Sequence, residues 1–278
     1  MSVLHRLFAP VYAGGWAIGR VALGLALLAL WLPRASGIGD VWGVEDMVFS
    51  EWPFHLADHW VPSLAEAWAL WGGGLLGIGL LLFGGRATRP GLLLWLACEW
   101  ALLAAEGLNT KAYDRLLFWV VVGFLVSPAG ERGLLDAARS PAARWFLLIV
   151  YSAIYGSTGW LKVSEEGAAW ARGEVLAYHL VHKHFGLQPL GVWVSGQPWL
   201  TQAFSWATLA FECAFPLLVW FRRANPALLA LGASMHLGIL ALMNVGPFSY
   251  VALAAYPVLL HPDAAARIVA RLWRRAAD

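Results

Sequence analysis

The sequence predicts an all-α fold, a polytopic membrane helix bundle of about eight transmembrane helices with both termini cytoplasmic. Apolar residues make up 60% of the 278 residues and charged residues only 13%, whereas soluble domains carry about 25% charged residues. A soluble protein of this length needs more polar side chains to cover its surface, so the composition excludes a soluble enzyme. The 18 tryptophans fit the same class, because the Trp ring prefers the membrane interface. With a net charge of +2, no nucleic acid is expected as a partner.

Several apolar stretches approach the length of about 20 residues that a helical span needs. They are residues 14–33, 64–83, 91–108, 114–128, 143–161, 200–221, 225–244 and 246–261. Most of the remaining chain lies in two segments, 34–63 and 162–199, which we expect to be loops. The lipid bilayer is therefore the expected partner, and the chain is expected to form a single transmembrane domain over residues 1–278.

The basic residues set the expected orientation. With the N-terminus inside, most of the 19 basic residues fall in inner segments, as the positive-inside rule requires. This places both termini in the cytoplasm and the loops 34–63 and 162–199 on the extracytoplasmic side. The inner stretches 131–142 and 262–278 mix charged and apolar residues, and we expect each to form a short amphipathic helix on the membrane surface.

Five ionisable residues fall inside the expected spans. Each charge costs about 2.5–3.5 kcal/mol on insertion scales, so such residues are usually paired and often functional. They are Arg20, Glu99, Glu106, Glu212 and His236. Glu99 and Glu106 share one helical face. The simpler interpretation pairs Arg20 with one of these carboxylates, and the alternative is a polar cavity around a carboxyl group.

Glu212 and His236 lie on consecutive antiparallel spans at a similar expected depth. One interpretation is a pair that handles protons, because histidine titrates near neutral pH. The other is a hydrogen bond that only holds the helices together. The residues do not decide between the two.

Lys162 closes the fifth apolar stretch in the sequence YGSTGWLKV (155–163). The small residues Ser157, Thr158 and Gly159 would let another helix or a flat ligand approach the backbone closely. A lysine at such a boundary usually extends to water, and the residues alone favour this interpretation. A buried Lys162 would instead be able to act as a neutral base.

Histidines and cysteines give no strong sign of a metal site. Residues 51–59 and 179–184 each hold a histidine cluster, but neither has a complete ligand set, so no metal is expected. Cys98 and Cys213 lie in apolar stretches without a CxxC motif, and we expect both to be small core residues. Hydrolase and nucleotide-binding motifs are absent from the sequence.

Three segments, together with Arg20, carry a family resemblance. The segments are GLNTKAYDRLLF (107–118), YGSTGWLKVSEEGAAWARGEVLAYHL (155–180) and HLGILALMNVGPFSYVALAAYPVLL (236–260). In their order and expected topology they resemble the transmembrane module shared by the vitamin K-dependent gamma-carboxylases and the bacterial HTTM proteins. The resemblance covers nearly the whole chain and implies a multi-pass protein of a bacterial inner membrane.

The resemblance implies a site. In the carboxylases a lysine of the second segment deprotonates vitamin K hydroquinone, and Lys162 stands at the matching position, so the likeness raises the expectation that it lies in a cavity. Glu212 and His236 match a polar pair of the transmembrane core, and these three are the candidate catalytic residues. The expected cofactor is a quinone or hydroquinone in an extracytoplasmic-side pocket. The candidate ligand-binding residues are Arg20, Glu106, Asn109, Trp160 and Trp170.

The sequence also departs from the carboxylases. Thr110 follows Asn109 where they have a histidine, and Leu161 precedes Lys162 where they have paired lysines. The carboxylase domain that grips the peptide has no counterpart in these residues, so we do not expect peptide carboxylation by this chain alone. A quinol-dependent, carboxylase- or epoxidase-like activity is the first hypothesis. The alternatives are a non-catalytic scaffold or accessory subunit, with a protein partner at the extracytoplasmic loops, and a small-molecule transporter.

Overall fold

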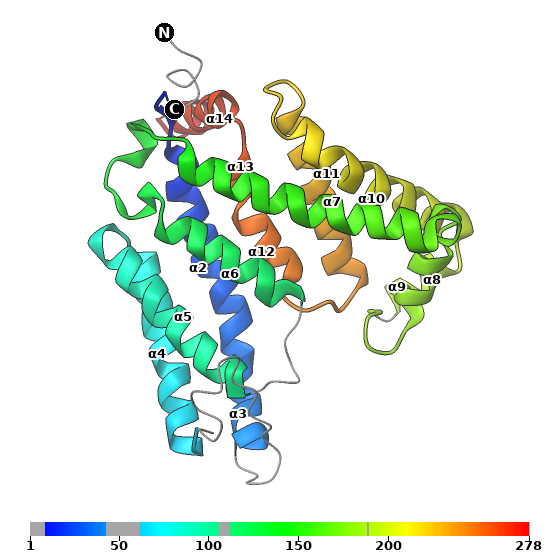
Figure 1. Ribbon diagram of the computed structural model, residues 1–278, viewed down its shortest axis with the longest axis horizontal. Coiled ribbons are helices and arrows are strands. Elements are labelled where there is room, and N and C mark those ends of the chain that lie inside the picture. The colour runs from blue at the N-terminus through cyan, green and yellow to red at the C-terminus, as the bar shows by residue number, and fades with distance from the viewer. Residues whose placement is uncertain (1–8, 43–61, 106–111, 188, 278) are drawn as a thin grey trace. The chain divides into compact units, whose positions relative to one another are not determined.

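A computed structural model describes residues 9–42, 62–105, 112–187 and 189–277 of the chain (Figure 1). The described residues are mostly helical, which confirms the all-α fold. The chain divides into two compact units, Met1–Ala143 and Arg144–Asp278.

The first unit is built on four long helices and short connecting elements. Its elements are β1 (Val11–Tyr12), α2 (Gly14–Trp31), η1 (Leu32–Arg34), α3 (Ala35–Trp42), α4 (Leu64–Phe83), η2 (Gly85–Ala87), α5 (Thr88–Ala105), α6 (Ala112–Leu125), η4 (Pro128–Gly130), η5 (Leu134–Asp136) and β2 (Ala138–Arg139). Ser63 and Glu66 form a capping box that starts α4. Helices α4 and α5 lie side by side, because Gly77 and Gly91 let their backbones come close: a Cβ at Gly77 would lie 2.7 Å from the Gly91 carbonyl oxygen.

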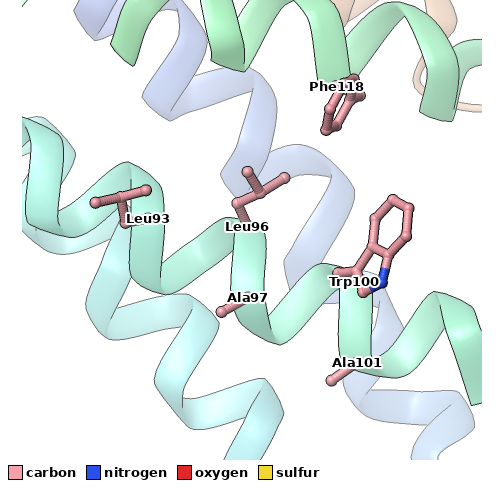
Figure 2. A pocket seen from close by; sticks show the side chains of 6 residues that line it. All are labelled: Leu93, Leu96, Ala97, Trp100, Ala101 and Phe118. Atoms are coloured by element: carbon pink, nitrogen blue, oxygen red, sulfur yellow. The ribbon is translucent and has the colours of Figure 1, made fainter. Parts of the chain in front are cut away.

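Helices α5 and α6 also border an apolar groove on the outside of this unit (Figure 2). Leu96 and Trp100 of α5 and Phe118 of α6 are among the side chains that line it.

The second unit contains α7 (Ala142–Ala171), which begins at the boundary between the units, and the elements after it. These are α8 (Glu174–Val181), α9 (Leu190–Ser195), α10 (Pro198–Leu218), α11 (Asn225–Leu242), α12 (Phe248–Ala254), α13 (Tyr256–Leu259) and α14 (Pro262–Ala277). The backbone of α7 leaves the helical region at Glu166, where φ is −127° and ψ is 19°. Helices α10 and α11 pack against each other.

Four helical segments of the described chain are long and apolar enough to cross a membrane. They are Gly14–Val41, Leu64–Phe83, Ala142–Ala171 and Asn225–Leu242. The other stretches expected as spans also fold as helices, namely α5, α6, α10 and α12–α13. The count of eight spans and the cytoplasmic termini stay predictions.

Three connecting segments differ from the expectation. Residues 131–142 do not form an amphipathic helix: Gly133 has a left-handed φ of 68°, which interrupts helical structure, and β2 pairs antiparallel with β1 instead. The segment 162–199, expected as a loop, is largely helical: residues 162–171 continue α7, residues 174–181 form α8 and residues 190–195 form α9. The amphipathic helix expected over 262–278 is confirmed as α14. In the loop expected over 34–63, residues 35–42 form α3, and the histidine cluster of residues 51–59 lies outside the described residues.

Candidate functional site

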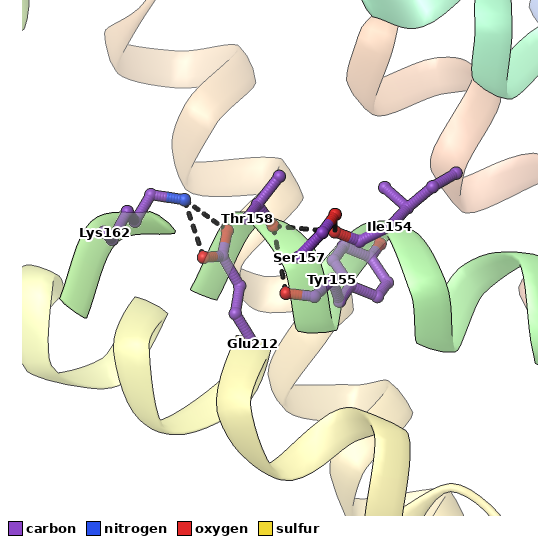
Figure 3. A network of polar contacts seen from close by, with 6 residues as sticks. All are labelled: Ile154, Tyr155, Ser157, Thr158, Lys162 and Glu212. Carbon is purple, nitrogen blue, oxygen red and sulfur yellow. Dashed lines mark hydrogen bonds and ion pairs between the residues drawn. The ribbon is translucent and has the colours of Figure 1, made fainter. Parts of the chain in front are cut away.

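Helix α7 carries a row of polar side chains along one face. Tyr151, Tyr155, Thr158 and Lys162 follow one another at spacings of three or four residues, which puts them on the same side of a helix. At one end of the row, Lys162 of α7 and Glu212 of α10 point toward each other (Figure 3).

Glycines of α7 allow this close approach. A Cβ added at Gly159 would lie 2.9 Å from the Glu212 Cβ and 3.1 Å from the Cys213 backbone nitrogen, and one at Gly156 would lie 2.8 Å from Pro216 Cγ. The small residues expected to admit a helix or a flat ligand therefore admit α10. Because the two backbones are so close, the Glu212 carboxylate comes within reach of Lys162.

Lys162 and Glu212 form an ion pair between the two helices. The Lys162 Nζ donates to both Glu212 carboxylate oxygens at 2.6 Å. The side chains are only 21% and 8% exposed. The Nζ also lies 5.2 Å from the centroid of the Trp170 ring, a cation–π distance. The interpretation that Lys162 simply extends to water is therefore wrong, because Glu212 holds its ammonium group between the helices.

His236 belongs to a second polar cluster of the same unit. Its fully buried ring places Nε2 2.7 Å from the Tyr155 hydroxyl and Nδ1 3.3 Å from the Ser249 hydroxyl. The Tyr155 hydroxyl also lies 3.1 Å from that of Tyr256. The expected Glu212–His236 pair is thus replaced by two separate contacts, because Tyr155 of α7 reaches His236 and Lys162 reaches Glu212.

The two clusters lie on one face of α7. Tyr155 and Lys162 are seven residues apart, a rise of about 10 Å along the helix. Between them the Thr158 hydroxyl makes 3.0 Å hydrogen bonds to the carbonyl oxygens of Ile154 and Tyr155 (Figure 3). This face therefore presents an ammonium–carboxylate pair at one point and a tyrosine–histidine pair two turns away, and both pairs can donate and accept protons.

Substitution of Tyr155 with phenylalanine tests the second cluster. It removes the hydroxyl that contacts both His236 and Tyr256, and it leaves buried polar atoms without that partner. We expect the free energy of unfolding to fall by about 1–3 kcal/mol, measured by thermal unfolding in detergent. The control Tyr250→Phe, at a side chain 44% exposed, should change little. Equal effects of the two substitutions would show that the Tyr155 hydroxyl contributes nothing specific.

Arg20 and Glu99 lie in the first unit and do not pair with each other. The Arg20 guanidinium donates to the carbonyl oxygens of Leu81 and Leu82 at 2.7 Å, near the end of α4 where helix carbonyls lack intrahelical partners. Glu99 is buried and pairs with Arg34, whose guanidinium lies 5.1 Å from the Trp31 ring centroid. Of the two carboxylates expected to pair with Arg20, Glu99 pairs with Arg34 instead, and Glu106 lies outside the described residues.

Of the two tryptophan candidates, one lies beside the Lys162–Glu212 pair. Trp170 contacts Lys162, whereas Trp160 is 69% exposed. Glu106 and Asn109 lie outside the described residues. Cys98 is buried as expected, but Cys213 is exposed, so the expectation that it is a core residue is wrong.

The histidines that follow α7 form a ring cluster. The His182 ring stacks on Phe185 at 5.1 Å, and the His179 ring meets Phe185 edge-on at 5.5 Å. Burial lowers the pKa of His179; the negative charge of Glu166 raises it and the positive charge of protonated His182 lowers it further.

Among the residues described, no group of three His, Cys, Asp or Glu side chains is arranged to hold a metal ion.

Sequence reasoning missed the partners that complete each pair. Tyr155, Ser249 and Tyr256 surround His236, and Arg34 neutralises Glu99. A usable signal exists for Tyr155, because its spacing of seven residues from Lys162 places both on one face of a helix.

Comparison with known proteins gives one match. The family model of the HTTM domain matches residues 17–264. No curated protein and no solved structure matches the chain.

Proposed function

The chain belongs to the HTTM family, and from that premise we propose that its second unit holds a proton-transfer site for a quinone-like ligand, with Lys162 as the base. The observation that carries the proposal is the position of the Lys162 ammonium, held between the Glu212 carboxylate and the Trp170 ring. This set fits a quinol: it offers one base, one carboxylate and one flat aromatic ring. A bound quinol would supply the acidic O–H group and the redox chemistry.

The pair can generate a neutral base without help from water. Transfer of one proton from Lys162 Nζ to a Glu212 oxygen converts the ion pair into a neutral amine and a neutral carboxyl group. Apolar surroundings favour this form over two charges. The Lys162 amine can then take a proton from a hydroxyl group, and the new ammonium is stabilised by the Trp170 ring. Glu212 stores the first proton during this step and thereby acts as a positioning and relay group.

The proposal includes the finer features that the sequence predicts. These are eight spans, cytoplasmic termini in a bacterial inner membrane and a ligand pocket on the extracytoplasmic side. They are supported by the distribution of basic residues and by the family resemblance. His236 and Tyr155 would serve the same site as a second proton donor and acceptor pair. Carboxylase- or epoxidase-like chemistry would follow the deprotonation if the chain is an enzyme.

Mass spectrometry of organic extracts from the purified protein tests the proposal. We expect a quinone in the wild-type extract, and at least about a tenfold loss in Lys162→Ala, because a charge-assisted hydrogen bond is removed. The control Lys183→Ala, at an exposed lysine, should retain the wild-type amount. Equal retention of quinone by all three proteins would show that Lys162 does not bind the ligand. A wild-type protein without any quinone would overturn the proposal.

One observation favours a non-catalytic scaffold as the second candidate. Exposed tryptophans gather on α9 and the first half of α10, where Trp193, Trp199 and Trp206 are 59%, 66% and 56% exposed. In that case the Lys162–Glu212 pair would be purely structural, and the tryptophans would contact a partner protein. Stoichiometric co-purification of a partner that is lost after Trp199→Ala, with no bound quinone, would support this candidate.

A further inference from the structure

The groove between α5 and α6 has almost purely apolar walls (Figure 2). It is open to the outside, has a volume of about 530 Å³, and is lined by Leu93, Leu96, Ala97, Trp100, Ala101 and Phe118. It lies entirely within the first unit and shares no residue with the Lys162 site.

An exposed arginine continues the groove at one end. Counting from Arg89 along α5, the groove residues of this helix follow at intervals of 4, 7, 8, 11 and 12 residues, so Arg89 lies on the same helical face. Arg89 is an exposed residue, and its guanidinium donates to the Ser127 carbonyl oxygen at 3.3 Å. Arg86, in the turn before α5, is also exposed. The end of the groove near Leu93 is therefore positively charged.

The opposite end has a different charge. Arg115 near the start of α6 is exposed, but Asp114 precedes it. Asp114 and Arg115 carry opposite charges, whereas Arg86 and Arg89 have the same sign. Charge complementarity therefore places an anionic group at the Arg89 end.

The distance from Arg89 to the far end of the groove matches one leaflet of a bilayer. Arg89 and Ala101 are 12 residues apart, which corresponds to about 18 Å along the helix. Half of a hydrocarbon core of about 30 Å is about 15 Å. An apolar groove of this reach with arginines at one end suits the acyl chain of an anionic lipid, whereas a helix of a partner or of a second copy would not need a positive charge at that end.

We propose that this groove binds one acyl chain of an anionic phospholipid, with the lipid phosphate at Arg89. The apolar walls take the chain, and the guanidinium offers charge-assisted hydrogen bonds to the phosphate. Trp100 and Phe118 lie at the far end, where the chain approaches the middle of the bilayer.

Native mass spectrometry of the protein released from nanodiscs tests this site. The discs contain equal amounts of dioleoyl phosphatidylglycerol and dioleoyl phosphatidylcholine, and the retained lipids are counted. We expect the wild type to retain the anionic lipid in preference, and Arg89→Gln to lower the ratio of anionic to zwitterionic lipid about fivefold. The matched control Arg115→Gln should keep the wild-type ratio.

A second variant tests the apolar part of the groove. Ala97 is exposed within the groove, so Ala97→Trp fills it without disturbing the helix core, and both lipids should be lost. An unchanged ratio in Arg89→Gln, or an unchanged lipid count in Ala97→Trp, would overturn the proposal. So would a wild-type dimer that Ala97→Trp converts to a monomer at an unchanged lipid ratio, since a second copy would then be the occupant.

Discussion

Glu212→Leu is expected to lower the free energy of unfolding by about 3–5 kcal/mol, because it leaves the Lys162 ammonium between two helices without its counter-charge. The lysine side chain is 21% exposed, so partial solvation of the ammonium places the expected value near the lower end of this range. Thermal or denaturant unfolding of the purified protein in detergent measures the change.

The double variant separates the charge effect from loss of packing. In Lys162→Met/Glu212→Leu both charges are gone and both positions keep side chains of similar size. Removal of a whole buried pair is often neutral or stabilising, so the double variant should recover most of the stability lost in Glu212→Leu. If the double variant is as unstable as the single one, the two residues are not energetically coupled.

An exposed pair of the same unit provides the control. Arg172 and Glu174 also form an ion pair, but their side chains are 59% and 56% exposed. Because water solvates these charges, Glu174→Leu should change the stability little.

The Lys162→Met/Glu212→Leu double variant also separates an effect on ligand binding from an effect on folding. It should be stable and yet retain no quinone.

Gly159→Ala is the second substitution with a large expected effect. In an open part of a helix, alanine is more favourable than glycine by up to about 1 kcal/mol. At Gly159 the new Cβ would lie 2.9 Å from the Glu212 Cβ and 3.1 Å from the Cys213 backbone nitrogen. Helices α7 and α10 must then separate, and such overpacking costs about 1–3 kcal/mol. We expect a lower unfolding temperature and a weaker Lys162–Glu212 pair.

The matched control for this prediction is Gly238→Ala. Gly238 also lies within a candidate membrane span, and a Cβ there would have no atom within 4 Å. The same substitution should therefore leave the unfolding temperature unchanged or raise it. A stabilising effect at Gly159 as well would contradict the close approach of α7 and α10.

Much of the fold could be predicted from local sequence. Apolar stretches such as 64–83 and 225–244 correspond closely to α4 and α11, because a long apolar run determines a helix largely by itself. Residues 131–142 could not be predicted in this way. Their composition is amphipathic, but Gly133 takes a left-handed φ and the following residues pair with β1, a contact that is distant in sequence.

The sequence by itself determined the class of protein, the helical segments and the buried charges that need partners. Only the tertiary structure decided which partners they have. Arg20 contacts backbone carbonyls, Glu99 pairs with Arg34, and Glu212 pairs with Lys162 and not with His236. The physical reason is that a partner is set by the depth and rotation of each helix against its neighbour. A glycine such as Gly159 sets the depth and rotation by letting two backbones approach closely, and the hydropathy of the sequence does not reveal such a contact.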